Sequence, residues 1–239
     1  MGLYDREYIR NKTLEQTGEE TTAGVRTKSQ LAVFIKQTYQ LFAASMIAGA
    51  AGSYVGVGAA AFVAANYWLI AIPWLIFGIF GLNLLKDKPG INLIALFAFT
   101  FVGGFMIGPL LSAILHMSNG AALVSNAFIT TAVIFGALSL YAMNTTRDFS
   151  SWGKPLMIAF VIIIVASLIN VFFFKSPLGM VVIEGIFLII ISAMVLYDTQ
   201  NIIRGAYSTP IEGAIALYLD FLNMFITLLQ LFGILGSDD

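Results

Sequence analysis

The sequence predicts an all-α integral membrane protein built from seven transmembrane helices. Of its 239 residues, 59% are hydrophobic and only 10% are charged, and the mean hydropathy is +0.90. An average soluble domain carries roughly a quarter charged residues. Because a helix needs about 20 apolar residues to cross a hydrocarbon core of about 30 Å, a chain of this length accommodates six or seven spans and little else.

Seven apolar stretches follow a polar and charged segment, 1–36. That segment lacks the apolar core and cleavage site of a signal peptide, so we expect a retained, partly disordered cytoplasmic tail. The transmembrane domain is expected to occupy 37–239. Its spans, bounded by charges or by Gly, Pro, Asn and Ser, are predicted at 37–57, 67–85, 91–115, 122–143, 155–174, 179–203 and 213–235.

The basic residues divide unevenly between the two sides of a seven-span bundle. Only Lys175 falls on one side. Since Lys and Arg gather in cytoplasmic loops, we expect the N-terminus in the cytoplasm and Asp238 and Asp239 outside. A six-span arrangement with one re-entrant stretch would put both termini on the same side and stays open. The residues on the cytoplasmic side are Arg6, Arg10, Lys12, Arg26, Lys28, Lys36, Lys86, Lys88, Arg147, Lys154 and Arg204.

Composition also argues against several classes of function. A net charge of −1 without basic clusters gives no electrostatic reason to expect nucleic acid. The chain has no cysteine and a single histidine, His116, so Cys-ligated metals and histidine clusters are excluded. It has neither a Walker-type phosphate loop nor an HExxH pair, so ATP-driven pumping and zinc proteolysis lack support. We expect no cofactor and no enzymatic activity.

Two of the spans contain helix-packing signals. Ala44, Ala48, Gly52 and Gly56 recur every fourth position in the first span. This spacing favours close packing of two helices, although a sliding contact is the alternative. Segment 103–109 places two glycines and a proline inside the third span, which predicts a kink.

Three acidic residues lie inside the predicted spans: Glu184, Asp198 and Asp220. Each costs at least about 2.5 kcal/mol to insert, so such residues normally face the bundle interior, share a proton or line a wet path. Asp198 lies six residues before Arg204, and Asp220 lies seven residues after Gly213. At about 1.5 Å per residue, the two carboxylates lie roughly 9 and 11 Å from the same end of antiparallel helices. The sequence therefore predicts a carboxylate pair at matching depth.

Similar polar residues accompany both aspartates. Asn201 and Asn223 follow three residues later, on the same helical faces. Tyr197 and Tyr218 precede them closely, as hydrogen-bond donors or as interfacial anchors. Glu184 lies four turns before the first aspartate, about 21 Å away on nearly the same face. It is either the other end of a polar path or an interfacial carboxylate.

Two carboxylates in contact within a low-dielectric bundle cannot both stay ionised cheaply. We therefore expect the pair to titrate as a unit and to respond to pH. The alternative is a set of helix-end carboxylates that are hydrated, or that pair with Arg147, Lys154 or Arg204.

The aspartates lie in the motifs LYDTQN at 196–201 and YLDFLN at 218–223. Further motifs are GGFMIGP at 103–109, RDFSS at 147–151, GIF at 185–187 and FGIL at 232–235. Together they resemble the Bax-inhibitor family of transmembrane proteins, in particular its bacterial YccA-type members. The resemblance covers almost everything after segment 1–36.

This resemblance implies a bundle with the last helix central, in the bacterial inner membrane. It also implies a proton-sensitive leak of calcium or another cation. Asp198 and Asp220 would be the pH sensor and gate, and they would bind the ion transiently.

Some family members latch the aspartate pair with an arginine at the end of the second span. This sequence has Lys86 and Lys88 there, and lysine lacks the bidentate fork of arginine. Arg147 and Arg204 are further candidate latches.

Two other functions stay open beside the cation leak. The first is a regulatory protein that binds a membrane-bound AAA protease of the FtsH type through segment 1–36. It is compatible with a leak. The second is an intramembrane aspartyl protease, since Tyr197 and Asp198 followed by Asp220 mimic a presenilin-like dyad. The residues before Asp220 lack the Gly-x-Gly of such enzymes, which argues against it.

Overall fold

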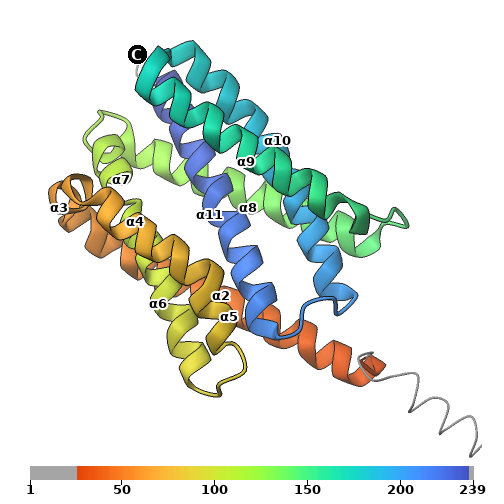
Figure 1. Cartoon of the computed structure of the whole chain (residues 1–239). Helices are drawn as coiled ribbons and strands as arrows, with labels where there is room; N and C mark the ends of the chain where they lie inside the picture. The colour runs from red at the N-terminus through yellow and green to blue at the C-terminus, as the bar shows by residue number, and fades with distance from the viewer. Residues whose placement is uncertain (1–25, 237–239) are drawn as a thin grey trace, which may run out of the picture.

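The computed structural model describes residues 26–236, which fold into a bundle of seven membrane-length helical segments. The all-α, seven-span fold class is confirmed, and no strand occurs in these residues (Figure 1). The first span is α2 (Lys28–Gly58), and the second runs from α4 (Tyr67–Ile76) through a π-helical turn at Phe77–Gly81 to α5 (Leu82–Leu85). The third consists of α6 (Ile91–Met106) and α7 (Gly108–Leu115). The short helix α3 (Ala60–Ala65) joins the first two. The others are α8 (Gly120–Asn144), α9 (Gly153–Ile169), α10 (Pro177–Ile203) and α11 (Pro210–Leu235).

Local capping explains where two of these helices begin. The Thr27 side chain accepts a hydrogen bond from the Gln30 backbone N–H, and Gln30 Oε1 accepts one from the Thr27 backbone N–H. Helix α2 therefore begins at Lys28, nine residues before the expected first span. The described part of segment 1–36 is thus mostly helical, and its first 25 residues lie outside the described chain. Thr209 and Glu212 form the same reciprocal cap at the start of α11.

Helices α2 and α6 approach each other closely because glycines line their contact. A Cβ atom at Gly52 would overlap the Phe101 carbonyl, and one at Gly104 would overlap the Gly49 carbonyl. Of the four small residues predicted to pack in the first span, Gly52 and Gly56 lie in this contact and serve close packing. The predicted kink of the third span is also present, because α6 ends at Met106 and α7 begins at Gly108.

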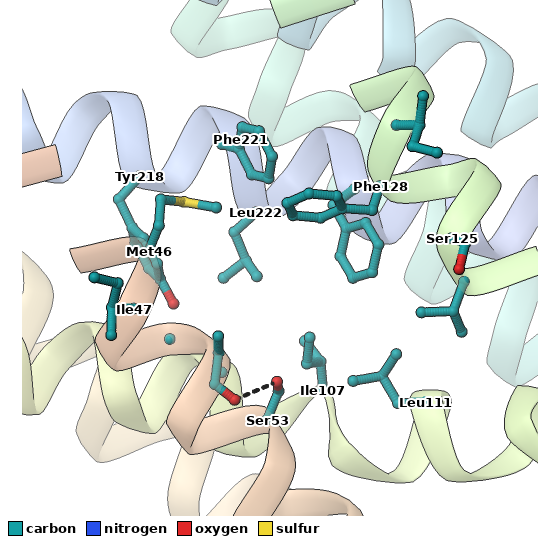
Figure 2. Close-up of a pocket in the computed structure, with 16 residues that line it drawn as sticks. Met46, Ile47, Ser53, Ile107, Leu111, Ser125, Phe128, Tyr218, Phe221 and Leu222 are labelled. Atoms are coloured by element: carbon teal, nitrogen blue, oxygen red, sulfur yellow. Dashed lines mark hydrogen bonds between the residues drawn. The ribbon is translucent and has the colours of Figure 1, made fainter. Parts of the chain in front are cut away.

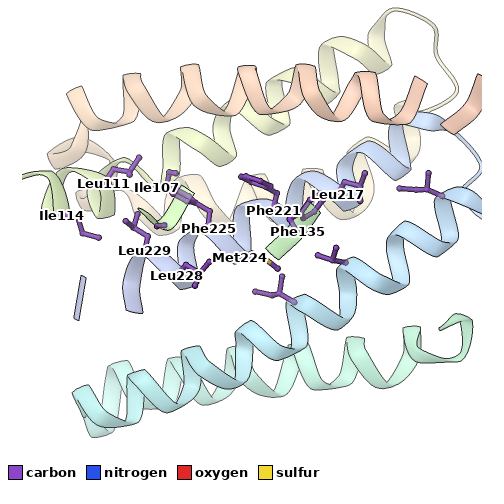
Figure 3. Packing of buried hydrophobic residues seen from close by; sticks show 14 of the residues in the cluster. Ile107, Leu111, Ile114, Phe135, Leu217, Phe221, Met224, Phe225, Leu228 and Leu229 are labelled. Carbon is purple, nitrogen blue, oxygen red and sulfur yellow. The ribbon is translucent and has the colours of Figure 1, made fainter. Parts of the chain in front are cut away.

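The last helix is the centre of the bundle. Helix α11 packs against α2, α6, α8 and α10, and it supplies much of the buried core (Figures 1 and 3). Phe221, Met224, Phe225 and Leu228 of α11 are buried there. The outer faces of α4 and α9 expose large apolar side chains, which suits contact with lipid.

Candidate functional site

The two predicted aspartates lie side by side at one end of the contact between α10 and α11. Asp198 is 6% exposed and Asp220 is 2% exposed. Their carboxyl groups are close enough to share a hydrogen bond when one carries a proton. Within the described chain, Asp220 Oδ2 is buried without a hydrogen-bond partner. The predicted proximity is therefore present, in a setting where two bare charges would be costly.

A tyrosine from the loop between α10 and α11 completes this pair. The Tyr207 hydroxyl donates a hydrogen bond to Asp198 Oδ1 at 2.6 Å. Burial, and then the neighbouring Asp198 carboxylate, raise the pKa of Tyr207 above its ordinary value. The phenol therefore keeps its proton and stays a donor. Such a bond favours the ionised form of Asp198.

Arg26 holds the loop that carries Tyr207. Its Nη1 donates to the Gly205 carbonyl at 2.6 Å, and its Nη2 donates to the carbonyls of Tyr207 and Ser208 at 2.9 and 2.7 Å. The guanidinium also lies 3.9 Å from the centre of the Phe34 ring. Gly205 has a φ of 68°, a conformation that glycine adopts without strain. Residues just before α2 thus fix the backbone beside the aspartates.

Lys86 holds the same loop from the end of the second span. Its Nζ lies 2.8 Å from Glu212 Oε1 and 3.2 Å from the Ser208 hydroxyl. The hydrogen bond to Glu212 raises the pKa of Lys86, so it stays charged at neutral pH. Lys86 therefore ties the loop to the start of α11, and in the described chain it pairs with Glu212 and not with the aspartates.

The loop before α9 is attached to the end of α10 that carries Asp198. Gln200 Nε2 donates to the Arg147 carbonyl at 2.6 Å, and the Phe149 backbone N–H donates to Gln200 Oε1 at 2.8 Å. Arg204 pairs with Asp148 at 2.5 Å. The Ser150 backbone N–H, together with Arg204, lowers the pKa of Asp148 to about 2. Arg204 is thus engaged outside the aspartate pair.

Several predicted supporting residues lie elsewhere. The Tyr218 hydroxyl donates to the Thr100 carbonyl at 2.6 Å, so it holds α6 against α11. Tyr197 packs against Gly153 at the start of α9. Within residues 26–236, neither Asn201 nor Asn223 forms a side-chain hydrogen bond to an aspartate. Asn201 and Asn223 lie one turn from the aspartates on the same helical faces, but the hydrogen bond to the pair comes from Tyr207 in the loop.

No basic side chain pairs with either aspartate in the part of the chain that is described. Lys88 and Arg147 form no ion pair there, while Lys86 and Arg204 have the partners given above. The described residues also hold no group of three or more His, Cys, Asp or Glu that would suit a metal ion. Among residues 26–236, no basic side chain therefore forms the direct latch on the pair that the family resemblance implies.

Glu184 lies at the opposite end of the same helix contact. It is 6% exposed and faces the hydroxyl of Thr227 on α11. Between this end and the aspartates, Ile191, Val195 and Met224 are fully buried. The contact between α10 and α11 is therefore polar at both ends and closed by apolar side chains in the middle. We call these three residues the apolar plug.

Sequence reasoning missed three residues of the site: Tyr207, Arg26 and Gln200. Tyr207 and Gln200 were available as polar side chains close to Asp198 in sequence. Arg26 had no comparable signal, because it lies 179 residues from the Gly205 carbonyl that it binds. Only the folded chain brings it to the loop.

Comparison with known proteins agrees with this architecture. The sequence model of the family described as inhibitor of apoptosis-promoting Bax1 matches residues 31–237. An uncharacterized protein of Campylobacter jejuni is 44% identical over 238 residues, 97% of both chains. An uncharacterized protein of Helicobacter pylori strain J99 is 40% identical over the full length of both chains.

A relative with a functional name is the modulator of FtsH protease YccA of Escherichia coli K12. It is 31% identical over 164 residues, which cover 67% of this chain and 74% of the relative. The family model covers most of the chain, and several relatives are more than 30% identical to it. The chain belongs to the Bax-inhibitor family.

Proposed function

We propose that the protein is a pH-sensitive leak for calcium or a related cation, gated by Asp198 and Asp220. The observation that carries the proposal is the buried, adjacent carboxyl pair at one end of a helix contact whose centre is apolar. Acidic residues buried in membrane helices commonly mark ion or proton pathways. Hydrophobic constrictions close such paths by excluding water.

The gate would work through one shared proton. While the pair holds that proton, a hydrogen bond between the carboxyl groups keeps α10 and α11 together. As the pH rises the proton leaves, and two neighbouring carboxylates repel each other. Separation of the helices would wet the apolar plug, and the exposed oxygens would attract Ca²⁺, which prefers oxygen ligands. Cation flux should therefore increase with pH.

Liposome flux tests this proposal. Purified protein would be reconstituted with a calcium dye inside the vesicles, and initial uptake rates would be measured between pH 5 and 8. Protein-free vesicles measure the background, and K⁺ in place of Ca²⁺ measures selectivity. We expect protein-dependent uptake that rises with pH. Uptake equal to that of empty vesicles at every pH would remove the leak.

A second candidate function is regulation of a membrane-bound protease of the FtsH type. The observation that favours it is the E. coli relative, which is named a modulator of that protease. We propose segment 1–36 as the contact. A chain that begins at Arg26 keeps the three hydrogen bonds from Arg26 to the loop between α10 and α11, so it should fold. We expect it to co-purify more weakly with the protease. Undiminished co-purification would exclude residues 1–25 as the contact.

A further inference from the structure

A cavity of about 660 Å³ lies between α2, α7, α8 and α11 (Figure 2). Its walls are almost wholly apolar. Two of the three polar side chains that line it have partners already: the Ser53 hydroxyl donates to the Ala50 carbonyl at 2.8 Å, and the Tyr218 hydroxyl donates to the Thr100 carbonyl. The third, Ser125 of α8, is exposed. Such a cavity does not attract water, because water needs several polar partners to enter.

The cavity opens sideways, toward the space that the bilayer fills. Phe42 of α2 and Phe135 of α8 stack with their ring centres 5.4 Å apart, and Phe42 lies one helical turn before the lining residue Met46. Beyond that stack, the rim residues Ile47 of α2 and Ile129 of α8 are 73% and 59% exposed. Both rim residues lie well inside helices that are long and apolar enough to span a membrane, so in a bilayer the opening would face hydrocarbon.

We propose that this cavity binds an acyl chain of a bilayer phospholipid. Its volume lies within the range of roughly 300–1,000 Å³ that is usual for small-ligand sites. A partner helix about 10–12 Å wide with its side chains is too bulky for it. Two lining residues, Leu111 of α7 and Phe221 of α11, are each 7% exposed, and we call them the floor residues. A chain must therefore enter the bundle to reach them, which separates this site from lipid that merely coats the outside.

The bound chain would press on the helix that carries Asp220. Tyr218, Phe221, Leu222 and Phe225 of α11 all line the cavity. Asp220 lies among them in sequence, on the face turned toward α10. An acyl chain could bind here whether or not the protein conducts cations. Once bound, it would favour one position of α11.

Photochemical labelling tests the site in liposomes. The lipid would be phosphatidylcholine with a diazirine near the end of one acyl chain, and adducts would be mapped by mass spectrometry. We expect adducts on the floor residues Leu111 and Phe221. Ala50→Trp fills the mouth of the cavity and should reduce those adducts severalfold. Ala51→Trp is the matched control, because Ala51 is also exposed but does not line the cavity.

Three outcomes would overturn the site. The first is wild-type labelling confined to outward-facing residues of α4 and α9, a result that needs no variant to fold. The second is unchanged floor labelling in a folded Ala50→Trp variant. The third uses the absence of native cysteine. Rapid reaction of a Leu222→Cys variant with a membrane-impermeant maleimide would show a water-filled cavity.

Discussion

Tyr207 donates a hydrogen bond to Asp198 across 2.6 Å, and thereby joins the loop between α10 and α11 to the buried carboxyl pair. Arg26 binds the backbone of that loop at three carbonyls. The segment before α2 is therefore connected to the aspartates through two sets of hydrogen bonds. A change at either one should alter the pH response of the pair.

Tyr207→Phe should move the midpoint of the flux-against-pH curve to higher pH. The phenol donates a hydrogen bond that stabilises the ionised form of Asp198, so its loss disfavours ionisation. The pair then keeps its shared proton, which holds the gate closed, up to a higher pH. A hydrogen bond to a charged group is worth roughly 1.5–3 kcal/mol, and one pH unit corresponds to about 1.4 kcal/mol, so the expected shift is about one to two pH units. Calcium uptake into liposomes measures it. An unchanged midpoint would place Tyr207 outside the gate.

Arg26→Gln should shift the same midpoint in the same direction, by less than Tyr207→Phe. It loosens the loop but leaves the phenol in place. Lys28→Gln is the matched control, because Lys28 is exposed and forms no ion pair in the described chain. The double variant of Arg26 and Tyr207 should add little to Tyr207→Phe, since the two residues act in series. Fully additive shifts would contradict that series.

Asp148→Asn should leave the midpoint unchanged. Its folded pKa of about 2 lies below the ordinary value of about 3.9. The stability that its pairing contributes is therefore complete above about pH 4 and is lost only as the pH falls to about 2. Between pH 5 and 8 the Asp148–Arg204 pair does not titrate. A small fall in Tm without a change in the pH profile is expected, and a shifted profile would mean that the gate includes this loop.

Val195→Thr should raise the leak at low pH. Threonine has nearly the shape of valine, so the change places a hydroxyl in the apolar plug without opening a cavity, at a cost in stability of about 1–3 kcal/mol. Val182→Thr on the same helix is the control. Val195 is fully buried, whereas Val182 is 53% exposed. Equal fluxes for wild type, Val195→Thr and Val182→Thr would argue against a path along this helix contact.

Much of the fold could be predicted because apolar length is a local property of the sequence. The second and third spans, 67–85 and 91–115, coincide with Tyr67–Leu85 and Ile91–Leu115. The start of the first helix could not be placed from hydropathy, since Thr27 and Gln30 initiate it within a polar segment.

The site was predictable only where helical geometry decides it. Depth along two antiparallel helices placed Asp198 beside Asp220. The same geometry suggested Asn201, Asn223, Tyr197 and Tyr218 as supporting residues, and the folded chain gives that position to Tyr207 instead. The reach of Tyr207 depends on the shape of a loop held by a residue far away in sequence. No local pattern contains that information.

The most direct test of the gate is calcium uptake into liposomes across pH 5 to 8 for wild type, Asp198→Asn, Asp220→Asn and the double variant. An amide cannot release the shared proton, so each single change should flatten the rise of flux with pH. The double variant should resemble the single ones, because the two carboxyl groups act as one unit. Thermal unfolding of each variant would establish that the bundle is intact. The same rise of flux with pH in wild type and both single variants would contradict the gate.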